Sequence, residues 1–247
     1  MDVSTYAVEA SVEAEHWWFT GRRALFSRLI ASFALARDAN VLDIGTSTGT
    51  NLRMLRELGF SHVSGLDPSD EAIRWCSEKG LGVVTKGDVC NVPFPDASFD
   101  LVLATDVIEH VDDDARALAE IYRVLKPGAP LLLTVPAFQS LWGLQDEVSQ
   151  HKRRYRAGEV RQRMTHAGFD LRRAFYFNFF LFLPIMLART AIRMTGTRLK
   201  SENELNSPLV NAVLKSVFRA DVALAPHLHV PFGVSYLAVG MRAAQLR

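Results

Sequence analysis

Two aspartates and a glycine-containing turn are the features of this sequence best suited to binding a ligand. The apolar run Val41–Ile44 contains Asp43 and leads into a turn with Gly45 and Gly49, whose missing side chains let backbone approach a bound molecule. A carboxylate at a buried strand end, such as Asp43, needs a cationic or hydrogen-bonding partner. Asp67 follows the next apolar run, 24 residues after Asp43, where a carboxylate can accept both hydroxyls of a ribose. The pattern predicts a ligand that contains a nucleoside; a tight turn without a ligand is the alternative.

NAD and S-adenosylmethionine both carry such a ribose, and the glycine spacing distinguishes them. An NAD site usually shows Gly-x-Gly-x-x-Gly, whose N–H groups face a pyrophosphate. Here three residues separate Gly45 from Gly49, and Asp43 precedes the first glycine by two positions. Negative charge suits a sulfonium or ammonium better than a diphosphate, so the spacing favours S-adenosylmethionine.

A sheet is needed to bring these residues together, and the hydrophobic pattern predicts one. The predicted strands are Asn40–Ile44, His62–Leu66, Gly82–Lys86, Phe99–Ala104, Pro130–Val135, Asp170–Phe177 and Val234–Gly240. The predicted helices between them are Thr48–Leu58, Ser69–Lys79, Asp112–Leu125 and Ala157–Ala167. Alternating strands and helices with short connections are typical of an α/β fold, in which helices cover both faces of a mostly parallel sheet.

Over residues 41–135 the sequence resembles a class I S-adenosylmethionine-dependent methyltransferase of the small-molecule and quinone-modifying kind. The family pattern Asp-x-Gly-x-Gly-x-Gly matches Asp43, Gly45, Ser47 and Gly49, with Ser47 in place of the middle glycine. Further family segments match Gly65–Ser69, Lys86–Val89, Val92–Asp100, Asp106–Val111 and Leu125–Ala129, where Ala129 replaces a second glycine. We therefore expect a Rossmann-like, doubly wound sheet of about seven strands, mostly parallel with an antiparallel last strand.

The resemblance also implies how the chain is organised. We expect a single methyltransferase domain over residues 1–247, with a helical lid at 1–36 and a cofactor-binding core at 37–177. A helical insertion at 178–230, both apolar and basic, would precede the last strand and tail at 231–247.

The cofactor-binding residues implied by the resemblance come from five segments. Asp88 would accept a hydrogen bond from the amine of adenine, and the Val89 N–H would meet a ring nitrogen. Arg22 would reach the cofactor carboxylate from an N-terminal helix, and Ser47 would lie near the methionine half. The full set is Arg22, Asp43, Gly45, Thr46, Ser47, Gly49, Asp67, Pro68, Asp88, Val89, Thr105 and Asp106.

Methyl transfer from a sulfonium needs a general base only when the acceptor loses a proton, and a neutral histidine suits that task near pH 7. His110 and His151 are the predicted catalytic residues, because each follows a strand of the predicted sheet on the active-site edge. The alternatives are a helix-cap or loop role for His110 and a solvated basic loop for His151. His16, beside several aromatic residues, is a third candidate that ordinary core packing would also explain.

Composition narrows the class of protein. Two cysteines without a Cys-x-x-Cys pair give no reason to expect a metal site or a disulfide, and they fit a reducing cytoplasm, as does an N-terminus without a secretory signal. The net charge of +1 does not suggest a nucleic-acid partner. It conceals an asymmetry: residues 1–150 hold 12 basic and 22 acidic side chains, whereas residues 151–200 hold 12 and 2.

The basic segment is also rich in phenylalanine. As a helix, the uncharged run Ala174–Ala188 would span about 22 Å, less than the ~30 Å hydrocarbon core, and Pro184 should interrupt it. Two interpretations are open. The run can be a buried strand and a core helix, or it can cover an apolar substrate or lie on an anionic membrane through residues 172–219. In the second case Arg189 with Arg193, and Lys215 with Arg219, would form basic edges.

The sequence thus predicts an enzyme that transfers a methyl group to a small acceptor, lipophilic or presented by the membrane, in the cytoplasm or at its membrane face. A non-catalytic protein that binds S-adenosylmethionine is the alternative, and a nicotinamide-dependent oxidoreductase is less favoured because Gly-x-Gly-x-x-Gly is missing.

Overall fold

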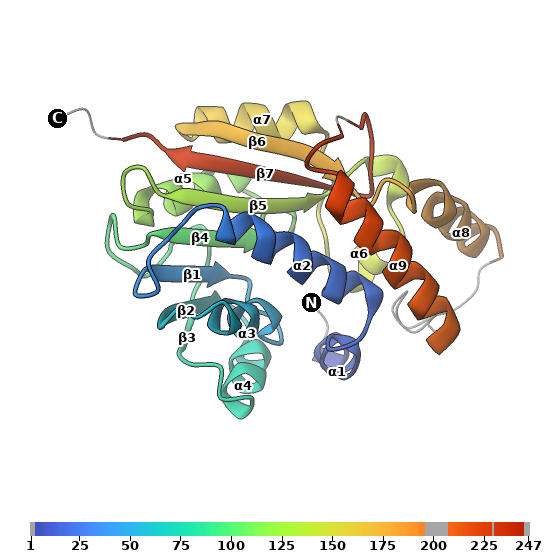
Figure 1. Ribbon diagram of the computed structural model, residues 1–247, viewed down its shortest axis with the longest axis horizontal. Helices are drawn as coiled ribbons and strands as arrows, with labels where there is room; N and C mark the ends of the chain where they lie inside the picture. Colours follow the sequence, from blue (N-terminus) through green and yellow to red (C-terminus); the bar gives the residue numbers. More distant parts are fainter. Residues whose placement is uncertain (1–2, 196–206, 229, 245–247) are drawn as a thin grey trace.

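A seven-stranded sheet of order β3-β2-β1-β4-β5-β7-β6 runs through the computed structural model, which describes residues 3–195, 207–228 and 230–244 (Figure 1). The strands are β1 (Asn40–Ile44), β2 (His62–Asp67), β3 (Val84–Lys86), β4 (Leu101–Thr105), β5 (Pro130–Pro136), β6 (Phe169–Phe177) and β7 (Ser235–Arg242). Strands β1 to β5 are parallel, and β7 is antiparallel to both neighbours. The predicted doubly wound sheet with an antiparallel last strand is confirmed.

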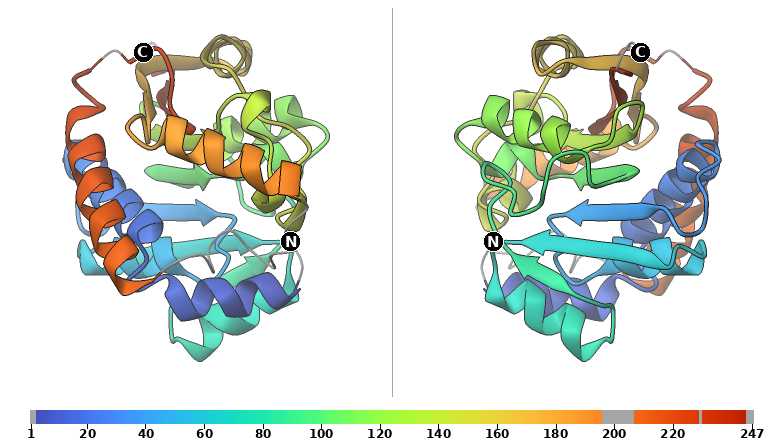
Figure 2. Two further views of the ribbon diagram at one scale, coloured as in Figure 1. Left: turned by 90° about the vertical axis from the view of Figure 1, so that its right-hand side faces the viewer. Right: turned by 90° about the vertical axis from the view of Figure 1, so that its left-hand side faces the viewer.

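Alternating side chains give the sheet two apolar faces, each covered by helices. The helices are α1 (Val3–Val12), α2 (Trp17–Ala31), α3 (Thr50–Glu57), α4 (Asp70–Glu78), α5 (Asp114–Val124), α6 (Leu144–Val148), α7 (Ala157–His166), α8 (Phe182–Thr195) and α9 (Pro208–Leu224). Leu42 and Ile44 of β1 pack with residues of α5 and α7, whereas Val41 packs with residues of α2, α3 and α9. Figure 2 shows α2 and α9 on one side of the sheet and α5 on the other.

Two of the differences between predicted and observed boundaries lie at glycines with positive φ. The third predicted strand starts at Val84 because Gly82 has a φ of +93°, and the first predicted helix starts at Thr50 because Gly49 has a φ of +88°. Helix α6 and the two short 3₁₀ turns, η1 (Ile108–His110) and η2 (Gln139–Leu141), were not predicted. Such single turns are too short for a periodic pattern.

The aromatic residues of the N-terminal segment and of the last third are packing partners. Trp18 of α2 stacks on Phe218 of α9 with ring centroids 5.4 Å apart, and on Phe177 of β6 at 6.2 Å. Trp17 meets the same Phe218 edge-on at 5.2 Å. Phe177 and Phe218 are fully buried, so this part of the phenylalanine-rich segment belongs to the core.

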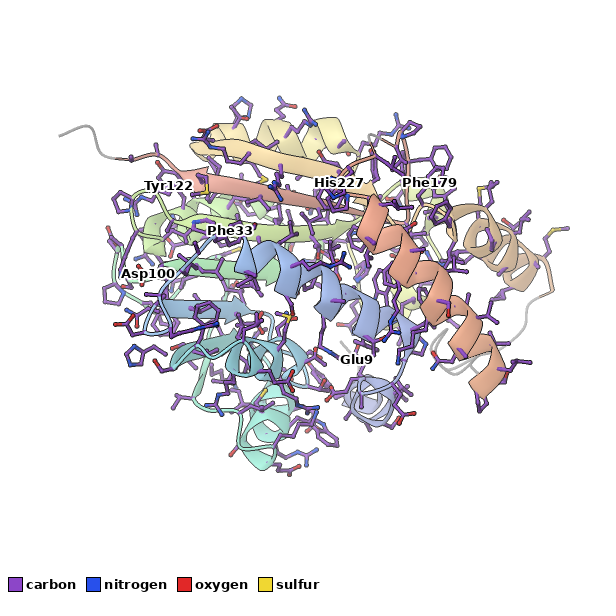
Figure 3. All side chains as sticks on the ribbon, viewed as in Figure 1. Glu9, Phe33, Asp100, Tyr122, Phe179 and His227 are labelled. Carbon is purple, nitrogen blue, oxygen red and sulfur yellow. The ribbon has the colours of Figure 1, made fainter. Side chains whose placement is uncertain are left out.

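A buried acid ties α9 to the loop that leaves β6. The Asp221 carboxylate accepts hydrogen bonds from the backbone N–H groups of Asn178 (2.7 Å), Phe179 (2.6 Å) and Phe180 (2.9 Å). Figure 3 shows Phe179 at this end of the sheet, beside α8. The acid thereby fixes where α8 begins and how it approaches the carboxyl ends of the strands.

Two expectations for the insertion are wrong. Pro184 does not interrupt a helix: it lies in the first turn of α8, where a missing N–H removes no helical hydrogen bond. Arg189 does not form a basic edge either, because it is buried and its guanidinium donates to the Leu141 carbonyl. Within the described ranges no helix combines the length and hydropathy that a membrane span needs. Residues 196–206 of the predicted insertion lie outside those ranges.

The contact between α2 and α9 predicts an unusual response to alanine at Gly21. A Cβ at Gly21 would lie 2.2 Å from the Phe218 ring, so Gly21→Ala should overpack this interface and destabilise the protein by roughly 1–3 kcal/mol in urea unfolding. The control is Gly158→Ala in α7, where a Cβ meets nothing within 4 Å and should be neutral or stabilising by up to about 1 kcal/mol. Equal effects of the two substitutions would contradict the packing argument.

Candidate functional site

A cavity of about 550 Å³ opens at the carboxyl ends of β1, β2, β4 and β5. Helices α1, α2 and α8 contribute to its walls. It brings together these predicted site residues: Arg22, Gly45, Thr46, Ser47, Asp67, Pro68, Asp88, Val89, Thr105, Asp106, His110 and His151. Asp43 and Gly49 do not line it. Ligand pockets usually measure roughly 300–1,000 Å³, so this cavity can hold a molecule of cofactor size.

The turn after β1 fixes the carboxylate of Asp67. Gly45 has a φ of +74° and Ser47 of +45°, and this bend aims the Ser47 N–H at Asp67 Oδ2 (3.1 Å). The Ser69 N–H donates to Asp67 Oδ1 (2.9 Å). Burial raises the pKa of Asp67, and these two hydrogen bonds oppose that rise. A carboxylate has about four acceptor positions, so one further position remains on each oxygen for a ligand.

Helix α1 is fastened over this turn by two glutamates. The Ser47 hydroxyl, which stands where the family pattern has glycine, donates to Glu9 Oε2 (2.8 Å). Burial raises the pKa of Glu9, and Figure 3 shows this side chain on the sheet side of α1. One turn further on, Glu13 accepts from Lys79 (2.8 Å) and from the Thr48 hydroxyl. The serine therefore has a structural partner that the sequence pattern did not suggest.

Asp43 acts one layer behind the cavity. The Asn51 amide donates to Asp43 Oδ1 (3.0 Å) and to Thr105 Oγ1 (3.0 Å), and so connects β1, α3 and β4. Asp43 Oδ2 has no hydrogen-bond partner among the described residues. Burial raises the pKa of Asp43 to about 8. The hydrogen-bonding partner predicted for Asp43 is therefore present for one of its two oxygens, and it is Asn51, which itself lines the cavity.

Arg22 reaches the cavity, where it pairs with a protein carboxylate. Its guanidinium forms an ion pair with Asp106 (2.5 Å), and a second nitrogen donates to Thr134 Oγ1 (3.2 Å). The same group lies over the rings of Trp18 (5.1 Å) and Phe26 (5.2 Å). These contacts hold a positive charge at the wall formed by α2.

His110 and His151 both line the cavity and contact each other edge-to-face, with ring centroids 4.7 Å apart and an angle of 83° between the planes. Burial and the neighbouring His151 lower the pKa of His110 to about 4, so His110 is neutral at pH 7. His151 Nδ1 lies 2.8 Å from Asp146 Oδ1. Burial alone would raise the pKa of Asp146, but hydrogen bonds from His151 and Arg154 lower it to about 2. An ionised partner of this kind orients the imidazole and fixes its tautomer.

The basic segment that contains His151 is docked on the protein rather than solvated. Arg154 is buried and donates to both oxygens of Asp146 (2.8 and 2.9 Å). Arg153 pairs with Asp114 (3.3 Å) in the first turn of α5. The alternative of a solvated loop around His151 is therefore wrong.

His16 has a structural role. Its Nδ1 accepts from the Trp18 N–H (3.3 Å) and so caps α2. Burial lowers the pKa of His16 to about 4. The side chain also lines the cavity, and its hydrogen bond explains why a histidine stands before the aromatic run.

Sequence reasoning missed several residues of the site. Asp146 contacts His151, and Glu9 contacts Ser47, only because segments far apart in the sequence come together, which no local pattern reveals. Glu109 had a signal, since it precedes His110 in the segment quoted for the resemblance; it is fully buried, and neither oxygen has a hydrogen-bond partner within the described residues. Asn178 lines the cavity, and its amide atoms likewise lack partners there.

Known proteins resemble this chain most strongly over the cofactor half. Residues 42–133 match the family described as methyltransferase domain. A Mycolicibacterium smegmatis protein named as an S-adenosylmethionine-dependent methyltransferase is 29% identical over 160 residues, or 64% of this chain and 61% of the relative. A Listeria monocytogenes demethylmenaquinone methyltransferase is 38% identical over 107 residues, or 38% and 44%. The chain thus spans less than two thirds of the length of these curated relatives.

Solved structures share the fold at low identity. A chain from the complex between the Haloferax volcanii Trm112 methyltransferase activator and a methyltransferase has a TM-score of 0.66 at 22% identity, over 99% of this chain and 96% of that chain. The [4+2]-cyclase SpnF has a TM-score of 0.59 at 21% identity, over 89% and 80%. Since one of these neighbours is named as a cyclase, the fold alone does not fix the reaction.

The raised pKa of Asp43 predicts a pH dependence of stability. A raised carboxyl pKa stabilises the folded state fully below the unfolded value of about 4, and this contribution is lost as pH rises to about 8. Asp43→Asn keeps the acceptor for Asn51 and removes the titration. Its stability relative to wild type should rise with pH in this window by up to about 1.4 kcal/mol per pH unit. Urea unfolding at pH 5 and pH 7.5 measures this, with the exposed Asp70→Asn as control. Parallel pH profiles for wild type and Asp43→Asn would refute the argument.

Proposed function

We propose that this chain transfers a methyl group from S-adenosylmethionine to a small, lipophilic acceptor, since residues 42–133 match a methyltransferase domain and a relative is named as an S-adenosylmethionine-dependent methyltransferase. One observation carries this proposal: the same cavity is lined by the Asp67 turn, which suits a nucleoside, and by two imidazoles in contact with each other, those of His110 and His151. The carboxylates of Glu9, Asp67 and Asp106 in its wall suit a positively charged sulfonium.

The described residues fit the cofactor at several points. Asp67 keeps acceptor positions for two ribose hydroxyls, and Asp88 and Val89 line the cavity next to it, where the family resemblance assigns adenine. Arg22 supplies the positive charge for a carboxylate. When bound, S-adenosylmethionine supplies an electrophilic methyl group on sulfur.

The protein's contribution is to position the acceptor and exclude water, which can lower a barrier by roughly 7–11 kcal/mol. Helix α1, held by Glu9 and Glu13, covers the turn, and α2 covers the next part of the cavity through Arg22. We place the acceptor's reacting atom near His110 and His151. An imidazole can act there in two ways, by accepting a proton from the acceptor or by binding a cation that acidifies the acceptor.

The apolar wall supports a lipophilic acceptor. Apolar side chains from α2, α8, α9 and the segment before β7 line the cavity: Trp17, Trp18, Phe19, Ile185, Ala188, Ile192, Leu214 and Val234. Asn178 places one amide among them that can orient a polar group of the acceptor. The name of the Listeria relative, a demethylmenaquinone methyltransferase, is in line with such an acceptor.

Calorimetry with S-adenosylmethionine tests the cofactor half of the proposal. Wild type should bind it, and Asp67→Ala should weaken binding at least 100-fold, because the substitution removes both ribose acceptors and the anchor of the turn. Asp70→Ala is the matched control, since Asp70 is 81% exposed three residues away. Tight binding of NAD in place of S-adenosylmethionine would overturn the assignment.

The acceptor half is tested with a methyl-labelled donor and fractionated cell extract. Label should appear in the lipid-soluble fraction with wild type and Asp70→Ala, and not with Asp67→Ala. Binding without transfer to any fraction would favour the non-catalytic alternative, and label confined to water-soluble products would contradict a lipophilic acceptor.

We also propose that α8 and α9 contact an anionic membrane. Leu183, Leu187 and Met194 repeat at helical spacing on α8 and are 56%, 65% and 82% exposed. On α9, Leu209 and Val213 are 77% and 55% exposed. Figure 2 shows both helices at the same end of the molecule. Apolar side chains this exposed support an interfacial surface.

Flotation with liposomes measures this contact. Wild type should float with phosphatidylcholine vesicles that contain phosphatidylglycerol, and Leu183→Asp/Leu187→Asp should reduce the bound fraction several-fold. Lys215→Glu/Arg219→Glu should reduce binding to anionic vesicles only. Val83→Asp is the control, since Val83 is 78% exposed and lies before β3. Equal flotation of all variants would exclude a membrane role for these helices.

A further inference from the structure

Three side chains of metal-ligand type converge at the acceptor end of the cavity. One carboxylate oxygen of Glu109 and one ring nitrogen each of His110 and His151 all lie within 4.8 Å of one another. Glu109 and His110 belong to η1, directly after β4, and His151 belongs to the segment after α6. The Lys152 N–H donates to the Glu109 carbonyl (2.8 Å), so the backbone already holds the two segments together.

Glu109 is the observation that calls for an explanation. Its side chain is fully buried, and neither carboxylate oxygen accepts a hydrogen bond from the described residues. An unpaired buried carboxylate costs several kcal/mol, so folded proteins pair such groups or neutralise them. The nearby arginines are engaged elsewhere, since Arg154 binds Asp146 and Arg22 binds Asp106. A bound cation would supply the missing partner.

His151 is oriented as metal-binding histidines usually are. Its Nδ1 faces Asp146 Oδ1 at 2.8 Å, which leaves the other ring nitrogen for a ligand role. Asp146 is itself fixed by Arg154 and by the Gly143 N–H (2.8 Å). These contacts fix the orientation of the His151 ring, and the His110 ring lies against it with centroids 4.7 Å apart.

We propose that Glu109, His110 and His151 bind a divalent transition metal ion of the zinc class. Two imidazoles and one carboxylate suit zinc and its first-row neighbours, whereas magnesium and calcium prefer oxygen ligands alone. Ligand atoms around a tetrahedral zinc lie roughly 3.4 Å apart, whereas these three lie within 4.8 Å of one another, so binding needs each pair to approach by at most about 1.4 Å. The proposal departs from the sequence-based expectation of no metal site.

Because His110 and His151 both line the cavity, a metal ion bound to them would be accessible to a molecule in the cavity. On the basis of the proposed function, we infer that the methyl acceptor is a hydroxylated compound. A hydroxyl oxygen bound there is acidified as zinc-bound water is, and its proton leaves to solvent water. The oxygen then forms the new bond to the methyl carbon as the carbon–sulfur bond of the sulfonium breaks.

Metal binding is tested without donor or acceptor. The purified full chain is stripped with a chelator and titrated with Zn²⁺ by calorimetry, and with Co²⁺ by visible absorption. Wild type should bind one equivalent, and His151→Ala and Glu109→Gln should each weaken affinity at least about 10-fold. The controls are His166→Ala and His227→Ala, two exposed histidines outside the cluster, which should bind as wild type does.

Glu109→Gln separates a ligand from a structural residue. Glutamine resembles a protonated glutamate in shape, so it would preserve a purely structural role but not a charged ligand. Without metal, this variant should unfold at the same or higher urea concentration than wild type, because a buried carboxyl group is gone. Zinc should raise the unfolding midpoint of wild type and not of Glu109→Gln. Should Glu109→Gln fail to fold, His151→Gln takes its place.

Two outcomes would overturn the proposal. The first is that wild type does not bind one equivalent of Zn²⁺, and the second is that Glu109→Gln and His151→Ala both bind Zn²⁺ with the affinity of wild type. Either result leaves the cofactor assignment intact, since that depends on Asp67 and is measured with S-adenosylmethionine. Conversely, if wild type binds zinc but transfers no methyl group, the assignment of a hydroxylated acceptor is wrong and the metal site remains.

Discussion

The burial of carboxylates at one edge of the sheet is the constraint on which the site depends. Ionised groups removed from water need partners, and here the partners come from elements far apart in the sequence. Asp67 takes N–H groups from two turns, Asp43 takes the amide of Asn51, and Asp106 takes the guanidinium of Arg22. Each pairing fixes one wall of the cavity, so the acidic lining that suits a sulfonium also assembles the walls around it.

The same requirement explains how the two ends of the chain meet. Arg22 can reach Asp106 only if α2 crosses the sheet edge, and that position is secured by the stacking of Trp18 on Phe218 of α9. Helix α9 in turn holds the exit of β6 through Asp221, which brings α8 to the cavity. Aromatic packing thus positions the helices, and the pairing of carboxylates then positions the side chains that those helices carry.

The sequence predicts the parts of this arrangement that are encoded locally. Alternating apolar residues give the strands, and the glycine turn with Asp67 gives the cofactor end, because both depend on neighbours along the chain. Pairings between distant segments leave no such pattern. Arg189 looks like an edge residue by helical spacing, yet it turns inward to the Leu141 carbonyl. Glu9 looks like a surface acid on a short helix, and only the fold brings it to Ser47.

Glu109 differs from the other buried acids in a way that separates the two halves of the cavity. At the cofactor end, Asp67 is positioned by protein groups and keeps acceptor capacity for a ligand. At the acceptor end, both oxygens of Glu109 lack a hydrogen-bond partner in the described part of the chain, next to an imidazole that Asp146 already orients. Replacing an unpaired buried acid with an apolar residue of similar volume is often neutral or stabilising, so an acid kept without a protein partner calls for a reason. Burial raises the pKa of Glu109 in the absence of a partner, and a cation shared with His110 and His151 is the partner that we propose for its ionised form.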